Sequence, residues 1–218
     1  MKSIVCLLVS LVSLPAFSAE YSLATFSVDV TIPLNHRCMG VLPTKSKRIA
    51  DSLYAHGFVL NGGPKPVVLC ALDWCEIRNG AFEQWRTALA EAADTTVAHV
   101  LVTALHQHDA PVVDLDAQRL LDKVGLPNEL YQVDWHDKTL ARVAQAVKDS
   151  LDFTSPVTHY GTSEVEVERI ASNRRVVLES GVITYGRGSR SGGNDFMAKA
   201  PEGAIDQMLK TITFFNGD

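Results

Sequence analysis

Two histidines separated by a single residue, His106 and His108, form the pattern in this sequence that is best suited to chemistry. They follow an apolar run, residues 97–104, that has the length of a core strand. Because residues i and i+2 of an extended backbone point to the same side, both imidazole rings can face one pocket. Neutral imidazole is a common ligand of zinc. The spacing therefore predicts a metal site at the end of this strand, rather than two unrelated structural or surface histidines.

Three carboxylates are candidates for supporting roles around the histidine pair. Asp109 follows His108 directly, and its carboxylate can accept a ring N–H and so orient a metal ligand. Asp73 and Glu76 follow another apolar run, residues 67–72, and can line the same crevice if the two runs are neighbouring strands. They are equally compatible with the start of a helix, with Asp73 as the N-cap and Glu76 at the third helical position.

The flanking segments predict a β-α-β unit that positions these residues. The run 67–72 predicts a buried strand covered on both faces, residues 79–93 have apolar side chains at helical spacing, and residues 97–104 predict the next strand. Such a unit joins parallel strands through a right-handed crossover. Ligand sites in α/β sheets lie at the carboxyl ends of the strands, which is where this prediction places His106.

The rest of the chain completes a single α/β domain in this interpretation. We expect a mixed, mostly parallel sheet with helices packed on its faces. Residues 186–194 are rich in Gly, Ser and Arg and predict a surface loop. A second amphipathic helix is predicted at residues 135–151, and further strands at residues 26–32, 53–60, 157–160, 165–170 and 212–215.

The N-terminus has the layout of a secretory signal peptide. Lys2 precedes an apolar run at residues 4–14, and small residues follow up to Ala19. The run is too short for a permanent membrane helix, which needs about 20 apolar residues. We therefore expect residues 1–19 to be removed and the mature protein to be exported to the periplasm or the medium.

The composition is that of an ordinary soluble protein. Apolar residues make up 46% and charged residues 21% of the chain. The formal net charge of -5 argues against a nucleic-acid partner, because phosphate binding needs a basic surface. No segment after the leader is apolar enough to span a membrane.

Removal of the leader would leave three cysteines, Cys38, Cys70 and Cys75. An odd number leaves at least one thiol unpaired in an oxidising compartment. Cys70 lies inside an apolar run and is predicted to be a small core residue. Cys38 and Cys75 are the expected pair if a disulfide exists. Their spacing is not that of a cysteine-based zinc site.

The segment from Thr103 to Pro111, Thr-Ala-Leu-His-Gln-His-Asp-Ala-Pro, resembles the Thr-His-x-His-x-x-Pro segment of the N-terminal domain of neutral/alkaline non-lysosomal ceramidases. The similarity extends over nearly the whole mature chain and is nearest to bacterial ceramidase-like exported proteins. Further segments that are similar to the family follow in the family's order, at residues 29–33, 69–73, 173–175 and 200–206 and in the strand that leads to Phe215.

This resemblance implies a zinc-dependent hydrolase that cleaves the N-acyl bond of a ceramide-like lipid or another amide. It implies that His106 binds zinc and that His108 lies beside the metal, its water and the substrate. It also implies that Arg174, with its neighbour Arg175, helps to hold the substrate head group. Zinc would acidify the attacking water and polarise the amide carbonyl.

The sequence departs from the family in two respects. Gln107 and Asp109 stand where ceramidases carry other residues. The family's remaining ligands, a histidine, a glutamate and a tyrosine, would come after Asp218, so we expect residues 20–218 to be the N-terminal part of a longer hydrolase domain. A zinc site normally needs three protein ligands. This polypeptide alone is therefore expected to bind zinc weakly and to be inactive.

Other functions remain open at this stage. Metallo-β-lactamase-like enzymes use His-x-His-x-Asp-His, and here Asp109 follows the histidine pair directly. Amidohydrolase barrels also contain His-x-His, but such a barrel usually needs about 250 residues. Both hydrolase families fit less well than the ceramidases. The alternative from another class is a non-catalytic exported domain that keeps the fold and uses the crevice for binding.

Overall fold

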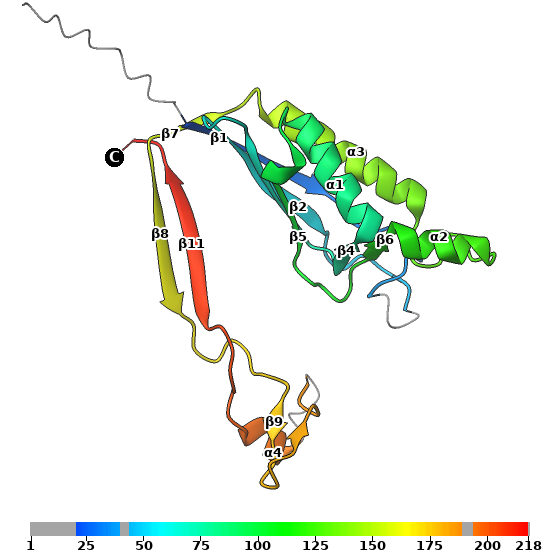
Figure 1. The fold of residues 1–218 in the computed structure, drawn as a ribbon. Helices are drawn as coiled ribbons and strands as arrows, with labels where there is room; N and C mark the ends of the chain where they lie inside the picture. Colours follow the sequence, from blue (N-terminus) through cyan, green and yellow to red (C-terminus); the bar gives the residue numbers. More distant parts are fainter. Residues whose placement is uncertain (1–20, 40–43, 189–193, 218) are drawn as a thin grey trace, which may run out of the picture. The chain divides into compact units, whose positions relative to one another are not determined.

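The computed structural model describes residues 21–39, 44–188 and 194–217 and divides into two compact units, Met1–Thr158 and His159–Asp218 (Figure 1). The expected signal peptide, residues 1–19, lies outside the described residues. Within the described residues, no helix has both the length and the apolar character that crossing a membrane would require.

A five-stranded sheet with the strand order β5-β3-β2-β1-β7 forms the first unit. Its strands are β1 (Tyr21–Asp29), β2 (Tyr54–Asn61), β3 (Val67–Leu72), β5 (Val100–Ala104) and β7 (Ser155–Val157). Strands β3 and β5 pair in parallel, as the β-α-β prediction requires, whereas β2 pairs antiparallel with β3 and β1 pairs antiparallel with β2 and β7. The predicted α/β class with a mixed sheet is thus confirmed, but most strand pairs are antiparallel, contrary to the expected parallel majority.

The physical reason lies in the connections. Only five residues, 62–66, link β2 to β3, and Gly62 supplies the positive φ of 109° that this turn uses. A parallel pair needs a crossover of a dozen residues or more, which helix α1 (Asn79–Ala92) provides between β3 and β5. The short connection therefore makes β2 and β3 antiparallel, even though the composition of β3 is that of a buried parallel strand.

Helices α1 and α3 (Val133–Ser150) lie side by side on one face of the sheet (Figure 1). The strand residues that face them are buried and alternate with more accessible ones, as in Val68, Cys70 and Leu72 of β3. On the other face of the same strand, Val67 is 41% exposed and Leu69 and Ala71 are only partly buried. The expectation that residues 67–72 form a strand fully covered on both faces was therefore wrong.

An aromatic cluster joins the helices to the sheet. Trp74 and Trp85 are fully buried and meet edge to face, with ring centroids 5.2 Å apart; such a pair stabilises by about 0.5–1.5 kcal/mol beyond the area it buries. The indole N–H of Trp74 donates to the Val30 carbonyl at 3.1 Å, and that of Trp135 donates to the Thr31 carbonyl at 3.2 Å. The Trp74 bond fixes the segment that follows β3, which carries part of the candidate site, and the Trp135 bond fixes α3 to the segment that follows β1.

Three further elements of the first unit were not predicted from the sequence. Strand β4 (Glu76–Arg78) pairs in parallel with β6 (Val112–Asp114), and helix α2 (Leu115–Lys123) follows β6 directly. The Asp114 carboxylate accepts the Ala117 N–H at 3.0 Å and caps α2. A 3-10 turn, η1 (Val97–His99), also replaces the beginning of the predicted strand 97–104.

The second unit is built around a long antiparallel ribbon. Strands β8 (His159–Glu166) and β11 (Met208–Phe215) pair along their whole length, and β9 (Val176–Val177) pairs with β10 (Ile183–Thr184). A short helix, α4 (Asp195–Lys199), follows. The single strand β8 overlaps both predicted strands, 157–160 and 165–170, and ends four residues before Ile170. Of the predicted loop 186–194, residues 189–193 lie outside the described residues.

Candidate metal site

His106 lies just after the end of β5, and its backbone is left-handed, with φ of 63°. Two backbone bonds hold it there: Leu105 N–H donates to the Leu72 carbonyl at 2.9 Å, and His106 N–H donates to the Trp74 carbonyl at 3.0 Å. The expectation of an extended backbone is therefore wrong for this residue, because the chain has already left the strand. The turn itself, tied to the segment after β3, sets the direction of the ring.

The two imidazole rings nevertheless lie close together. The ring centroids of His106 and His108 are 5.1 Å apart, with an interplanar angle of 76°. Two imidazoles that share one tetrahedral zinc through bonds of about 2.0 Å have centroids roughly 5 Å apart, so this separation fits a common ion. Both residues are exposed, and the side chain of His106 is 60% accessible. Solvent and a ligand can therefore reach both rings.

A cavity of about 620 Å³ lies beside the histidine pair. Besides His106 and His108 it is lined by the predicted carboxylates Asp73 and Asp109 and, from the segment before β2, by Asp51 and Ser52. The cavity therefore gathers two imidazoles and three carboxylates around one open space. Asp51 and Ser52 had no signal in the sequence, because they reach the cavity from a segment about 50 residues earlier in the chain.

Asp73 and Glu76 have different surroundings. The Asp73 carboxylate accepts the Tyr54 N–H at 2.8 Å, which fixes it at the end of β3 beside β2. Glu76 lies in strand β4 and lines a different cavity, which His106 also borders. Since helix α1 begins only at Asn79, the alternative in which Asp73 and Glu76 cap a helix is wrong.

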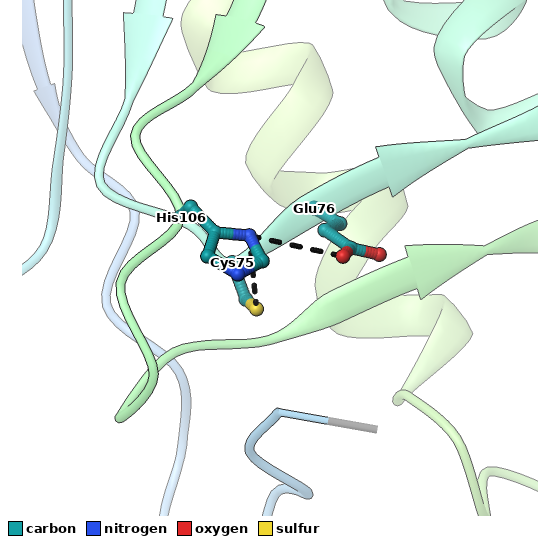
Figure 2. A group of neighbouring side chains, drawn as sticks. All are labelled: Cys75, Glu76 and His106. Carbon is teal, nitrogen blue, oxygen red and sulfur yellow. Dashed lines mark hydrogen bonds and ion pairs between the residues drawn. The ribbon is translucent and has the colours of Figure 1, made fainter. Parts of the chain in front are cut away.

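Glu76 forms a cluster with Cys75 and His106 (Figure 2). The Nδ1 atom of His106 lies 3.7 Å from Glu76 Oε1 and 3.9 Å from Cys75 Sγ. Figure 2 shows the ring edge pointing to both side chains. The histidine thus has acidic and sulfur partners on its Nδ1 side.

The three cysteines among the described residues are free thiols. Cys38, Cys70 and Cys75 are all buried, and the expected bond between Cys38 and Cys75 is not formed. Cys70 is completely buried, as predicted, and this burial raises the pKa of its thiol to about 12. Burial also raises the pKa of Cys75, Glu76 adds to that rise, and Arg78 opposes it.

The two candidate substrate residues lie in the second unit. Arg174 and Arg175 are exposed, and the Asn173 carboxamide orders their turn by accepting the Arg175 N–H at 2.9 Å. No pattern in the sequence indicated the role of Arg187, whose buried guanidinium donates to the carbonyls of Asn173, Met197, Ala200 and Pro201 at 2.6–3.3 Å. Arg187 is therefore a structural residue that holds this turn against α4.

Comparison with known proteins identifies the fold. No protein-family model and no curated protein matches the chain. Among solved structures, the chain is similar to one described as a ceramidase complexed with C2, with a TM-score of 0.60 and 14% identity. It is also similar to the neutral ceramidase from Pseudomonas aeruginosa, with a TM-score of 0.58 and 15% identity.

Each similarity covers 90% of this chain and 29% of the other, so the chain spans less than a third of the length of those enzymes. At this identity the likeness establishes the fold, and the fold of this chain is ceramidase-like.

Proposed function

We propose that this chain carries part of the active site of an exported, zinc-dependent amide hydrolase of the neutral ceramidase type. The observation that carries the proposal is the convergence of His106 and His108 on one open cavity, within a fold that resembles ceramidases. The leader-like residues 1–19 support the export.

The donor set of the cavity suits a zinc ion. His106 and His108 would hold the metal, and neither ring is buried among aliphatic side chains. When bound, zinc supplies a Lewis acid for an amide carbonyl and acidifies water to a pKa of about 7. The residues of the chain orient the site: the Trp74 carbonyl fixes the backbone of His106, and the Tyr54 N–H fixes the carboxylate of Asp73.

The polar lining of the cavity favours the part of the substrate that carries the amide and hydroxyl groups. Asp51, Asp73 and Asp109 offer hydrogen-bond acceptors for hydroxyl and amide N–H groups. These are the groups that surround the scissile bond of a ceramide-like N-acyl lipid. Arg174 and Arg175 are the proposed contacts for the head group. The substrate class follows from the similarity to ceramidases and is part of the proposal.

Hydrolysis of a fluorogenic N-acyl sphingosine by the natural gene product that contains this chain tests the proposal. We expect zinc-dependent turnover, and His108→Ala should lower kcat/KM by at least about 100-fold because the substitution removes a group at the metal. His99→Ala is the matched control, because His99 is a half-buried histidine next to the other end of β5, with its ring hydrogen-bonded to Thr96.

If His108→Ala turns over the substrate as fast as the wild type does, the assignment of the site is overturned. Zinc-free, inactive protein that keeps its fold would favour the non-catalytic binding domain instead.

A further inference from the structure

We propose that Cys75, Glu76 and the Nδ1 atom of His106 form a second zinc site, in a different cavity from the one that His106 shares with His108. The three ligand atoms lie within 4.8 Å of one another. This inference rests on the geometry of the cluster and does not depend on the proposed hydrolase function, although both sites use His106.

The spacing of the three atoms is near that of a tetrahedral zinc site. Bonds of about 2.0–2.3 Å at tetrahedral angles place neighbouring N, O and S ligands roughly 3.4–3.6 Å apart. The observed distances are 3.7 Å from Nδ1 to Glu76 Oε1 and 3.9 Å from Nδ1 to Cys75 Sγ, and all three ligand atoms lie within 4.8 Å of one another. The Cys75 and Glu76 side chains would therefore have to move toward each other by roughly an ångström to close the site around an ion.

The backbone already holds the three residues in place. Cys75 N–H and Glu76 N–H both donate to the Pro111 carbonyl, at 3.0 and 3.3 Å, and Glu76 pairs with Val112 between β4 and β6. His106 N–H donates to the Trp74 carbonyl next to Cys75. The protein would lose little backbone freedom when a metal binds here, which lowers the entropic cost of binding.

The carboxylate of Glu76 can serve a metal without losing its present partner. Its Oε2 atom forms an ion pair with Arg78, while Oε1 is the atom that faces His106. A cavity of about 410 Å³, lined by all three ligand residues, leaves room for water as the fourth ligand. Three protein ligands and one water complete a zinc coordination sphere within this chain.

The ligand types select the metal. A thiolate and an imidazole favour zinc over magnesium or calcium, which prefer oxygen ligands. A thiol must lose its proton to bind a metal, so binding at this site should weaken as the pH falls.

The shared histidine makes the two sites exclusive. A neutral imidazole binds a metal through one nitrogen and carries a proton on the other. Zinc on Nδ1 therefore leaves Nε2 protonated and withdraws His106 from the cavity that it shares with His108. Occupancy of the Cys75 site should thus switch off any hydrolase activity of the His108 site when zinc is in excess.

Cobalt substitution of the full chain tests the site, because a thiolate bound to Co²⁺ gives an intense near-ultraviolet charge-transfer absorption. We expect this absorption in the wild type, its loss in Cys75→Ser, and its displacement by zinc but not by magnesium. Glu76→Gln should weaken zinc binding by more than the roughly 10–100-fold typical of partners outside the coordination sphere.

Two control variants separate this site from its alternatives. Cys38→Ser removes another buried thiol and should keep the cobalt absorption, and His108→Ala should keep both the absorption and the zinc affinity. Circular dichroism verifies that each variant is folded, and Glu76→Gln provides the test should Cys75→Ser unfold. A wild-type cobalt complex without thiolate absorption overturns the proposal, as does loss of the metal in His108→Ala but not in Glu76→Gln. The latter result would leave the proposed hydrolase site intact.

Discussion

At the scale of single residues, His106 is the point where the backbone departs from its ordinary preferences. A left-handed conformation costs a non-glycine residue roughly 1–2 kcal/mol, and such residues persist where the surrounding structure holds them. Here the Leu72 and Trp74 carbonyls hold the turn. The result is a residue that borders both the His108 cavity and the cavity lined by Cys75 and Glu76. This placement gives the conformational strain a functional explanation.

If His106 carries strain for the sake of its ring, replacing it with glycine should not destabilise the fold. We expect His106→Gly to keep or raise the free energy of unfolding, by up to about 1 kcal/mol, because glycine adopts a positive φ without steric cost. Its exposed contact with Glu76 contributes little to stability.

Urea unfolding measures this difference, with His108→Gly as the matched control. His108 is exposed and has no positive φ, so glycine there should destabilise by about 0.5–1 kcal/mol. Equal losses in the two variants would show that the conformation of His106 is not strained.

The sequence revealed some residues of the site because they are close together in the chain. The pair His106 and His108, with Asp109, lies in one short segment, and its placement after a strand could be read from the apolar run before it. Cys75 was not predicted as a ligand because its partner is 31 residues away and a lone cysteine has no ligand spacing. A long-range pair of this kind becomes visible only when β4 and the end of β5 are brought together.

At the scale of elements, length decided what could be predicted. Strand β3 and helix α1 were predicted almost to the residue, because a six-residue apolar run and four helical turns carry clear periodicity. Strands β4 and β6 have three residues each, too few to show alternation, and they were missed. The direction of the strand pairs was also missed, because it depends on connections and not on the composition of the strands.

The packing of α3 against α1 includes a buried histidine that makes stability depend on pH. His136 is completely buried, and its Nε2 accepts the Trp85 indole N–H at 3.0 Å. Burial lowers the pKa of His136 below its ordinary 6.5, with Asp137 acting in the opposite direction. Burial lowers the pKa of His36 in the same way. Just below the ordinary pKa of histidine, each ring is therefore neutral in the folded protein, whereas the same histidine in the unfolded chain would be protonated.

The folded state thus binds fewer protons than the unfolded state below pH 6.5. The stabilisation from neutral His136 is fully present above pH 6.5 and is lost as the pH falls toward the lowered pKa. We expect the free energy of unfolding to decline in this range. In His136→Gln, which can still accept the Trp85 N–H, the decline should be shallower.

Denaturant titrations across this pH range measure both slopes, with His56→Gln as an exposed-histidine control that should leave the slope unchanged. His136→Leu should cost about 1–3 kcal/mol above pH 6.5, because it leaves the indole N–H of Trp85 buried without a partner. A slope that His136→Gln does not alter would assign the pH dependence to other groups.

At the scale of the whole molecule, the two units differ in how much they bury. The main hydrophobic core, with all three tryptophans packed in or against it, belongs to the first unit. In the second unit, large apolar residues of the β8–β11 ribbon are exposed, among them Tyr160 at 68% and Leu209 at 54%. A two-stranded ribbon is marginally stable by itself in water. Stability should therefore reside almost entirely in the first unit.

A chain that ends at Thr158 should consequently fold by itself. It contains the whole five-stranded sheet, helices α1 to α3, and the Cys75, Glu76 and His106 side chains. We expect it to unfold cooperatively and to retain the near-ultraviolet circular dichroism of the full chain, because Trp74, Trp85 and Trp135 keep their core contacts. It should also retain the cobalt–thiolate absorption, since no ligand of that site lies after His106. Residues 159–218 alone should show no cooperative transition. Loss of the tryptophan signal on truncation at Thr158 would mean that the second unit contributes to the core of the first.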